Sequence, residues 1–186
     1  MPAAYTAPNG VPYLMWGGLH GGQLQCWQNK SRYDPAWAGQ KEPETGNALS
    51  PQIARLSNTM HTLAESPRDL VISAPETEKP IQATDKGPEP WMHHRGDKYY
   101  LTYSTGTTHY LVYAMSNNPY GPFTYQGRLL EPVSGWTTHG SIVEHQGRWW
   151  LFYHDSKASG GVDWLRQVKV KEIFYDSAGK IVFTKP

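Results

Sequence analysis

The sequence predicts an all-β protein, and three observations predict it. Glycine (18) and proline (15) are scattered along the 186 residues, which is typical of many short strands separated by turns. The chain is polar on average, with a mean hydropathy of −0.63, yet it holds 8 Trp and 12 Tyr, so amphipathic rings supply much of its apolar surface. Finally, one hairpin pattern occurs three times along the chain, and this repeat indicates the architecture.

The repeated pattern is a short strand, a tight turn that ends in glycine, and then aromatic–Leu–x–aromatic. The three copies are residues 3–16 (AAYTAPNGVPYLMW), 91–103 (WMHHRGDKYYLTY) and 141–153 (SIVEHQGRWWLFY), with equivalent leucines Leu14, Leu101 and Leu151. The turn glycines are Gly10, Gly96 and Gly147. Glycine suits a turn position that needs a positive φ. In the second copy, alternation predicts that Tyr100 and Thr102 face one side of the sheet while Leu101 and Tyr103 face the other.

Further strands are expected after each hairpin. Third strands are predicted at residues 23–27, 111–116 and 165–170, and fourth strands at 123–130 and within 173–183. One segment also fits a helix, since Ile53, Leu56, Met60 and Leu63 have near-helical spacing within residues 50–63. However, the Ser50-Pro51 pair before them and the Ser57–Thr59 run inside fit a strand and a turn equally well.

Repeated four-stranded antiparallel units are typical of a β-propeller. We therefore predict a single partial propeller domain of about three blades, at approximately residues 1–74, 75–133 and 134–186. Three blades do not close a ring, since propellers have about four to eight. Two long linkers rich in Pro, Gly and charge, residues 33–47 and 75–90, are predicted to lie on a rim of the propeller, where sites are built.

The charge and cysteine content exclude several classes of function. Lys plus Arg (17) nearly balances Asp plus Glu (16), which argues against binding to duplex nucleic acid or an anionic bilayer through bulk charge. The single cysteine, Cys26, excludes an internal disulfide framework and a cysteine-built zinc site. Neither a signal pattern nor a membrane-spanning apolar run is visible, and with the absence of cysteine pairs this favours a cytoplasmic location.

Four stretches of the chain resemble glycoside hydrolase family 43, in the xylosidase/arabinofuranosidase branch. They are residues 2–25, 90–114, 118–156 and 159–170, and they cover over half of the chain in the order of the family. The resemblance implies a five-bladed type of propeller that cleaves β-xylosidic and α-L-arabinofuranosidic bonds. It also implies that the first blade of the family, which carries the general base Asp, has no counterpart here.

The resemblance further implies which carboxylates remain. A second family Asp, which tunes pKa and orientation, normally opens an Asp-Pro-Ala segment, and here Met1 stands before Pro2-Ala3. The family's Glu acid precedes the Trp of a Trp-Met-His stretch, so Glu89, two residues before Trp91, is the candidate catalytic acid. The alternative is a solvated loop carboxylate between two prolines. Asp34, Asp85, Asp155 and Asp163 are internal candidates for a replacement base.

Other site residues follow from the same resemblance. His139, in Thr-His-Gly-Ser, matches a histidine that contacts a cation in the channel, usually calcium through waters; the alternative is a hydrogen-bonded core histidine. Arg166 matches an arginine that points to the substrate, or it is a surface cation. Trp91, Trp136 and His109 are candidates to line the sugar subsite by stacking and hydrogen bonding, with core packing as the alternative. The adjacent pair His93-His94 is expected to be structural, because neighbouring strand residues face opposite sides.

Three functions remain open from the sequence. The first is an inverting glycosidase acting on xylo- or arabino-oligosaccharides, weak or dependent on assembly because two of the family's acids are missing. The second is a non-catalytic carbohydrate-binding propeller fragment, and the third is a protein–protein module that uses rim loops. Because three blades leave sheet faces uncovered, we also expect a homodimer in which two halves complete the ring.

Overall fold

The protein folds into three β-sheets that follow one another along the chain. The computed structural model describes residues 2–17, 51–73, 90–105, 109–135 and 139–186. The first sheet has the order β1 (Pro2–Thr6), β2 (Pro12–Trp16), β3 (Gln52–Arg55) and β4 (Arg68–Asp69). The last has the order β10 (Gly140–His145), β11 (Arg148–Asp155), β12 (Gln167–Tyr175) and β13 (Ile181–Val182). Within the described residues, no helix is long or apolar enough to cross a membrane.

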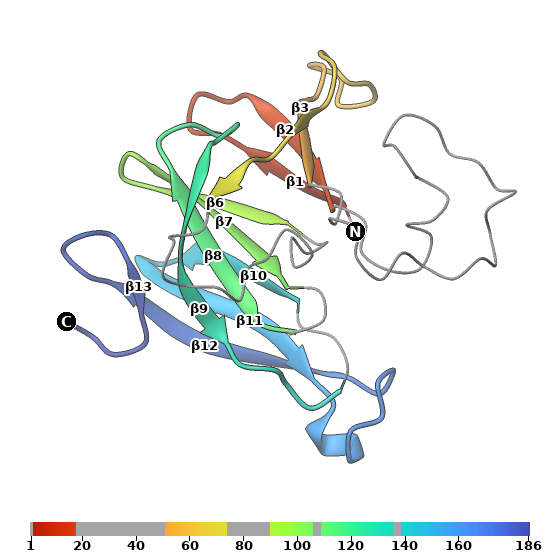
Figure 1. The fold of residues 1–186 in the computed structure, drawn as a ribbon, viewed down its shortest axis with the longest axis vertical. Helices are drawn as coiled ribbons and strands as arrows, with labels where there is room; N and C mark the ends of the chain where they lie inside the picture. The colour runs from red at the N-terminus through yellow and green to blue at the C-terminus, as the bar shows by residue number, and fades with distance from the viewer. Residues whose placement is uncertain (1, 18–50, 74–89, 106–108, 136–138) are drawn as a thin grey trace, which may run out of the picture.

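The middle sheet has five strands. Its antiparallel part consists of β6 (Trp91–Arg95), β7 (Lys98–Ser104), β8 (Leu111–Ser116) and β9 (Phe123–Leu130). The fifth strand, β5 (Ile72–Ser73), pairs in parallel with β9 at the outer edge. Figure 1 shows the three sheets in succession, with the middle sheet between the other two. This arrangement is a partial β-propeller, which confirms the predicted fold class.

The three predicted hairpins are present. They are β1–β2, β6–β7 and β10–β11, and their turn glycines Gly10, Gly96 and Gly147 have φ of 80°, 63° and 74°. The strands predicted at 111–116 and 123–130 are also present, as β8 and β9.

Other strand predictions need correction. Residues 52–55 form β3, and Leu56 then bridges to Leu63 after a turn, so the helical interpretation of residues 50–63 is wrong. The strand predicted at 165–170 begins at Gln167 and runs to Tyr175. Consequently, the strand predicted within 173–183 is reduced to the short β13. The strand expected at 23–27 and both long linkers, apart from Pro90, lie outside the described residues.

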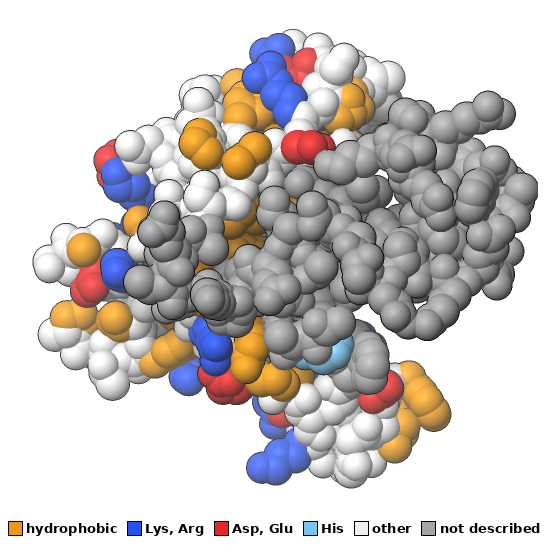
Figure 2. Space-filling model, viewed as in Figure 1, with side chains coloured by type: hydrophobic (Ala, Val, Ile, Leu, Met, Phe, Trp, Pro, Cys, Tyr) orange, Lys and Arg blue, Asp and Glu red, His pale blue; other side chains and the backbone are white. Residues whose placement is uncertain are grey.

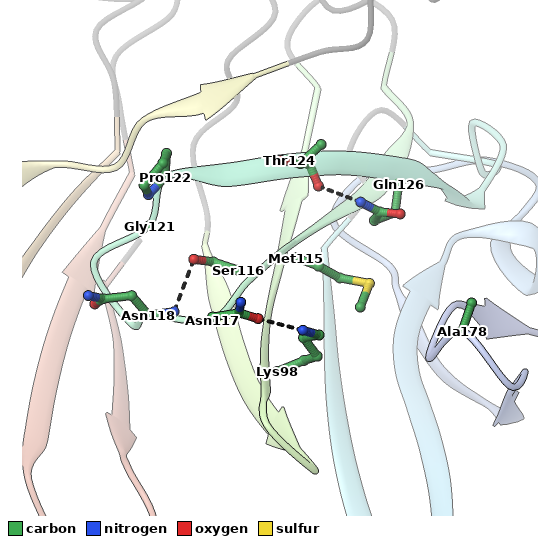
Figure 3. Close-up of a pocket in the computed structure, with 10 residues that line it drawn as sticks. All are labelled: Lys98, Met115, Ser116, Asn117, Asn118, Gly121, Pro122, Thr124, Gln126 and Ala178. Atoms are coloured by element: carbon green, nitrogen blue, oxygen red, sulfur yellow. Dashed lines mark hydrogen bonds between the residues drawn. The ribbon is translucent and has the colours of Figure 1, made fainter.

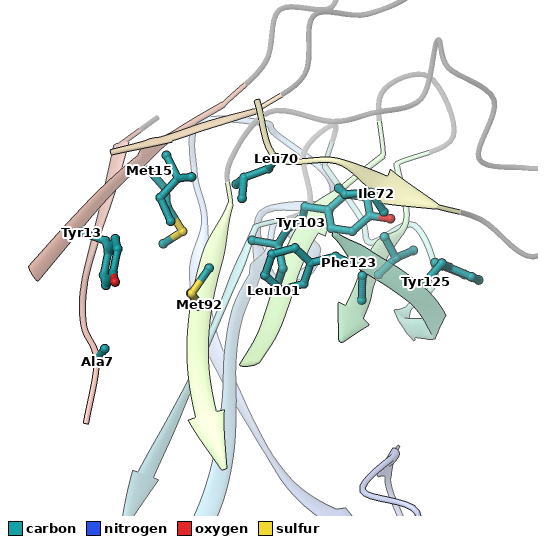
Figure 4. Close-up of a cluster of buried hydrophobic side chains, with 13 residues drawn as sticks. Ala7, Tyr13, Met15, Leu70, Ile72, Met92, Leu101, Tyr103, Phe123 and Tyr125 are labelled. Atoms are coloured by element: carbon teal, nitrogen blue, oxygen red, sulfur yellow. The ribbon is translucent and has the colours of Figure 1, made fainter. Parts of the chain in front are cut away.

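Two hydrophobic cores fill the spaces between the sheets. One lies between the first and middle sheets and includes Met15, Ile53, Leu101, Tyr103 and Phe123; Figure 4 shows its side chains meeting between the strands. The other lies between the middle and last sheets and is built from Tyr100, Leu111, Tyr113, Leu129, Ile142, Leu151, Ile173 and Ile181. Adjacent residues of β7 therefore enter different cores, as the predicted alternation requires.

Candidate functional site

The starts of β1, β6 and β10 lie at one end of the three sheets. These are the first strands of their sheets, and β6 lies against both β1 and β10. Tyr5, late in β1, contacts Tyr99, early in β7, with ring centroids 6.3 Å apart. The turn ends of the β1–β2 and β6–β7 hairpins therefore lie next to each other. At the other end, a Cβ on Gly140, the first residue of β10, would meet a side-chain atom of Leu111, the first residue of β8. The three inner strands therefore run in the same direction and begin together.

Four predicted site residues belong to this end of the molecule. Trp91 is the first residue of β6, and His139 comes one residue before β10. His109 comes two residues before β8, and Arg166 comes one residue before β12. By the antiparallel pairing, the start of β8 and the start of β12 lie at the same end as the starts of β6 and β10. We call this end, defined by Trp91, His109, His139 and Arg166, the strand-start face.

Trp91 links two of the sheets. It is half-buried, and its indole Nε1–H donates a hydrogen bond of 3.0 Å to the carbonyl of Ile142 in β10. The bond fixes the ring in one orientation between the inner strands of the middle and last sheets. Trp91 therefore connects the middle sheet to the last sheet, and it also lies at the strand-start face.

His139 is held in place by the tight packing of the next residue. A Cβ on Gly140 would lie 2.7 Å from Leu111 Cδ2 and 3.1 Å from the Phe152 carbonyl. A side chain does not fit in that space, so glycine lets β10 approach the middle sheet closely. His139 itself is half-buried, directly before this close contact between β10 and the middle sheet.

His109 lies in the connection between β7 and β8. Its backbone has a φ of 54°, and its side chain is half-buried. The connection is closed by Thr105, whose backbone N–H donates to the Tyr110 carbonyl (2.9 Å) and whose Oγ1 accepts from the Tyr110 N–H (2.8 Å). These two hydrogen bonds hold Thr105 and Tyr110 together on either side of the connection that contains His109.

Arg166 comes before the third strand of the last sheet, as His109 comes before β8, the third strand from β6 in the middle sheet. It lies between the second and third strands of the last sheet and is exposed. Its Nε–H donates to the carbonyl of Asp163 in the same connection, at 2.6 Å. No contact between Arg166 and Trp91, His109 or His139 is found among the described residues, so the structure brings Arg166 to the same face without joining it to them.

The predicted acid and one predicted aromatic lie outside the described residues. These are Glu89 and Trp136. The neighbour of Glu89, Pro90, is buried directly before β6. The assignments of Glu89 as the catalytic acid and of Trp136 as a sugar contact stay predictions.

Two of the four candidate bases can be placed. Asp155 ends β11, where its carboxylate accepts hydrogen bonds from Gln167 Nε2 (2.7 Å) and the Lys157 N–H (3.1 Å). The Gln167 hydrogen bond is the largest cause that lowers the pKa of Asp155, so the group stays ionised but is engaged with its own sheet. Asp163 is exposed in the β11–β12 connection. Asp34 and Asp85 lie outside the described residues.

The described residues do not form a calcium site by themselves. Calcium prefers six to eight oxygen ligands. Across the described ranges, no three His, Cys, Asp or Glu side chains lie together in a way that could hold a metal ion. His139 offers one imidazole, so the expectation that it contacts a calcium ion stays a prediction.

His93 and His94 face opposite sides of β6, as predicted. His93 is 5% exposed and faces the last sheet, where its Nε2 lies 2.8 Å from the Tyr175 hydroxyl. Its ring stacks on Tyr100, with centroids 4.6 Å apart. Burial lowers the pKa of His93 from 6.5 to about 3, so the imidazole is neutral at pH 7. His94 instead contacts Tyr99, with ring centroids 4.7 Å apart.

Sequence reasoning missed a charged contact between the first and middle sheets. The carboxylate of Glu65 accepts hydrogen bonds from the Tyr120 hydroxyl, the Arg55 N–H and the Arg55 guanidinium. Arg68 lies over the Tyr120 ring, 4.4 Å from its centroid. Glu65 and Tyr120 are 55 residues apart in sequence, and no local sequence pattern predicts that they are in contact.

A polar hollow lies at the opposite end of the middle sheet. Its volume is about 580 Å³, and Figure 3 shows side chains from β7, β8, β9 and the β12–β13 turn around it. The lysine in its wall, Lys98, donates to Asn117 Oδ1 at 2.6 Å and pairs with Asp97 at 3.1 Å. Its charge is thus satisfied within the protein, and none of the predicted site residues lies there.

Comparison with known proteins identifies the family. Residues 2–181 match the family model described as glycosyl hydrolases family 43. The chain is 55% identical over 192 residues to "Xylosidase/arabinosidase 43A" of Humicola insolens and 44% identical over 191 residues to "Beta-xylosidase" of Xylanibacter ruminicola. These alignments cover 100% and 99% of this chain but 59% and 57% of the relatives. The chain thus spans little more than half the length of these curated relatives.

Solved structures agree with this result. A β-xylosidase/α-arabinofuranosidase from a compost microbial metagenome, determined with xylotriose in a calcium-free form, superposes with a TM-score of 0.82 at 42% identity. A Xanthomonas citri enzyme of the same family, determined with xylose, also gives 0.82, at 43% identity. Each match covers 98% of this chain, and 57% and 55% of those chains respectively. The chain belongs to glycoside hydrolase family 43.

Proposed function

We propose that this chain is part of a glycoside hydrolase that cleaves β-xylosidic and/or α-L-arabinofuranosidic bonds of xylan-derived oligosaccharides. The observation that carries the proposal is the shared start of β6 and β10, tied by the Trp91–Ile142 hydrogen bond. This contact supports a shared face for Trp91 and His139, and Glu89 comes two residues before Trp91 in the sequence. Relatives described as xylosidases and arabinosidases, and related structures with xylotriose or xylose, support this choice of sugar.

In the proposed reaction, Glu89 is the general acid. Its carboxyl proton passes to the glycosidic oxygen as the bond to the anomeric carbon breaks and an oxocarbenium-like transition state forms. In the inverting mechanism, a carboxylate about 6.5–9.5 Å from the acid deprotonates the attacking water. The acid needs a raised pKa to be protonated near neutrality, which burial or a neighbouring anion supplies.

The remaining predicted residues bind the sugar. Trp91 presents a ring of fixed orientation because its indole N–H is already bonded to Ile142, and Trp136 adds a second stacking surface. His109 and Arg166 supply hydrogen bonds to hydroxyl groups, and the planar guanidinium of Arg166 is suited to hold two oxygens. We assign His139 a place at the same face, one residue before β10.

We expect the isolated chain to be slow, or to depend on assembly. The resemblance implies that the family's base has no counterpart in these 186 residues, and loss of such a group typically costs about 10²- to 10⁴-fold in rate. Asp155 is a poor replacement because Gln167 and the Lys157 N–H already occupy its carboxylate. This engagement favours the second candidate function, a non-catalytic propeller fragment that binds the same oligosaccharides.

Two measurements separate these functions. Hydrolysis of an aryl β-xyloside and an aryl α-L-arabinofuranoside is followed for the natural chain, for Glu89→Gln, and for the control Glu144→Gln, a matched change near the end of β10, away from the strand-start face. Hydrolysis that Glu89→Gln abolishes and Glu144→Gln retains supports the hydrolase. Calorimetric binding of xylotriose with no hydrolysis by any variant supports the binding fragment. A rate unchanged in Glu89→Gln removes Glu89 from the mechanism.

A further inference from the structure

The polar hollow of the middle sheet lies at the end opposite to the strand-start face. Lys98 is the first residue of β7 and Ser116 is the last residue of β8, and both line the hollow together with Gln126 of β9 and Ala178 of the β12–β13 turn. Its volume of about 580 Å³ falls within the roughly 300–1,000 Å³ of small-molecule sites. The hollow is therefore large enough for a small ligand, and it does not involve the outer faces of the first and last sheets.

Two neighbouring residues place hydrogen-bond donors in the hollow where β8 ends. Asn117 Oδ1 accepts from Lys98 Nζ at 2.6 Å, while its Nδ2 group has no hydrogen-bond partner among the described residues. Ser116 Oγ accepts from the Asn118 N–H at 3.1 Å, and its hydroxyl hydrogen is left to donate. Figure 3 shows both residues with the hydrogen bonds that hold them. Each side chain thus uses one hydrogen bond to fix its position and keeps a donor for a ligand.

A second wall of the hollow offers an acceptor. Gln126 Nε2 donates to the Thr124 carbonyl at 3.1 Å, which leaves Gln126 Oε1 without a hydrogen-bond partner in the part of the chain that the structure describes. The turn that carries Ala178 is fixed, because Asp176 Oδ1 accepts from the N–H groups of Ala178 and Lys180 at 2.9 and 2.8 Å. The walls are therefore formed before any ligand binds.

The charges around the hollow do not select an ion. Lys98 is the one charged residue among the described residues that line it, and it pairs with Asp97 at 3.1 Å. Figure 2 shows acidic and basic side chains next to each other along the left edge of the molecule, where the β6–β7 and β12–β13 turns lie in Figure 1. An ionised phosphate has only acceptors for Gln126 Oε1 to meet, and a calcium ion finds no carboxylate in the described lining. Hydroxyl groups both donate and accept, so a neutral ligand that carries them fits the walls best.

We propose that this hollow is a second binding site for a neutral oligosaccharide; the choice of a xylo-oligosaccharide rests on the function proposed above. Hydroxyl groups of the sugar accept from Asn117 Nδ2 and Ser116 Oγ and donate to Gln126 Oε1. Met115 is half-buried and lies between Asn117 and Gln126 in Figure 3. Its flexible thioether side chain can pack against the C–H face of the sugar ring.

The hollow and the strand-start face are separate sites for one substrate chain. Strand β7 has seven residues that each advance about 3.3 Å, so the two ends of the middle sheet are about 20 Å apart. A single sugar ring cannot reach from one end to the other. A longer chain held at the hollow has a raised effective concentration at the strand-start face, so the hollow retains a polymeric substrate without touching the reacting bond.

The test is a titration of the chain with xylotriose, followed by proton–nitrogen NMR of the backbone amides. We expect the amides of Ser116, Asn117 and Gln126 to shift, with a Kd on the order of 1 mM. Asn117→Ala and Gln126→Ala each remove one unpaired polar group and should raise this Kd about fivefold, while the rest of the spectrum shows that the fold is kept. Asn58→Ala, a matched change at an exposed asparagine between β3 and β4, should leave the Kd unchanged.

The location of the shifts separates this inference from the proposed hydrolase, because the amides of Trp91 and His109 report on the strand-start face. Hollow amides that do not shift with xylotriose, or that shift with the same Kd in Asn117→Ala and Gln126→Ala, overturn the inference. Tighter binding of inorganic phosphate than of xylotriose at the hollow also overturns it. Shifts at the hollow in a chain that hydrolyses no aryl glycoside support the second site while the hydrolase fails, and hydrolysis without shifts at the hollow overturns the second site alone.

Discussion

The buried imidazole of His93 makes the stability of the protein depend on acid pH. His93 lies between the middle and last sheets, where burial, with a smaller effect from His94, lowers its pKa from 6.5 to about 3. The groups that contact its ring are the aromatic side chains of Tyr100, Trp149 and Tyr175. The guanidinium of Arg95 lies over the Tyr175 ring, 4.4 Å from its centroid. A protonated His93 would therefore have the positive charge of Arg95 nearby.

The sign and size of the effect follow from linkage. The folded state keeps His93 neutral down to about pH 3, whereas the unfolded chain takes up a proton at about 6.5. Stability from this group is therefore complete above pH 6.5 and is lost as the pH falls toward 3. Each pH unit in this window costs about 1.4 kcal/mol, so about 3 kcal/mol is lost by pH 4.5.

The assay is urea unfolding between pH 7 and pH 4.5, monitored by tryptophan fluorescence. The natural chain is compared with His93→Gln, whose amide can still hydrogen bond to the Tyr175 hydroxyl but does not titrate, and with His145→Gln, a matched change at an exposed position. Carboxylates titrate equally in all three proteins, so the difference between slopes isolates His93. Equal slopes in the natural chain and His93→Gln would refute the reasoning, as would an NMR titration that finds the pKa of His93 near 6.5.

Three further changes have defined outcomes in the same unfolding assay. Glu65→Gln should cost about 1–3 kcal/mol, whereas Glu131→Gln, at an exposed carboxylate, should cost almost nothing. Burial acts to raise the pKa of Glu65, but the hydrogen bonds from Tyr120 and Arg55 outweigh it and lower the pKa. This contribution should therefore be complete above the usual carboxyl pKa and be lost as the pH falls below it through the lowered pKa of the folded state. Gly140→Ala places a Cβ against Leu111 and the Phe152 carbonyl and should cost about 1–3 kcal/mol; an unchanged midpoint would show that β10 can move away. Trp91→Phe removes the hydrogen bond to the Ile142 carbonyl and should lower the free energy of unfolding by about 1 kcal/mol. A free energy of unfolding equal to that of the natural chain would show that this hydrogen bond between the sheets contributes nothing.

The hairpins were predictable from the sequence because their information is local. A glycine that needs positive φ and the alternation of residues such as Leu101 and Tyr103 are both visible in a short window. Pairings between distant segments were not predictable in this way. The pairing of residues 52–55 with β2, the parallel strand β5 and the Glu65–Tyr120 contact all depend on tertiary closure, and no short-range pattern marks them.

The candidate site was predictable only in part. The resemblance marked Trp91, His109, His139 and Arg166, and the topology places all four at the strand-start face, with His109 and Arg166 each two strands away from the first strand of its hairpin. The structural role of Trp91 was not visible in the sequence, because its partner is a backbone carbonyl 51 residues later. The acid Glu89 stays a prediction from the sequence.

The stereochemistry of hydrolysis tests the central claim most directly. Proton NMR can follow the first sugar released from an aryl β-xyloside by a large amount of the chain, before mutarotation mixes the anomers. The proposed acid at Glu89 and an activated water predict that α-xylose appears first, and that the signal is absent with Glu89→Gln and present with Glu144→Gln. Release of β-xylose first, or the same release from Glu89→Gln, would contradict the account.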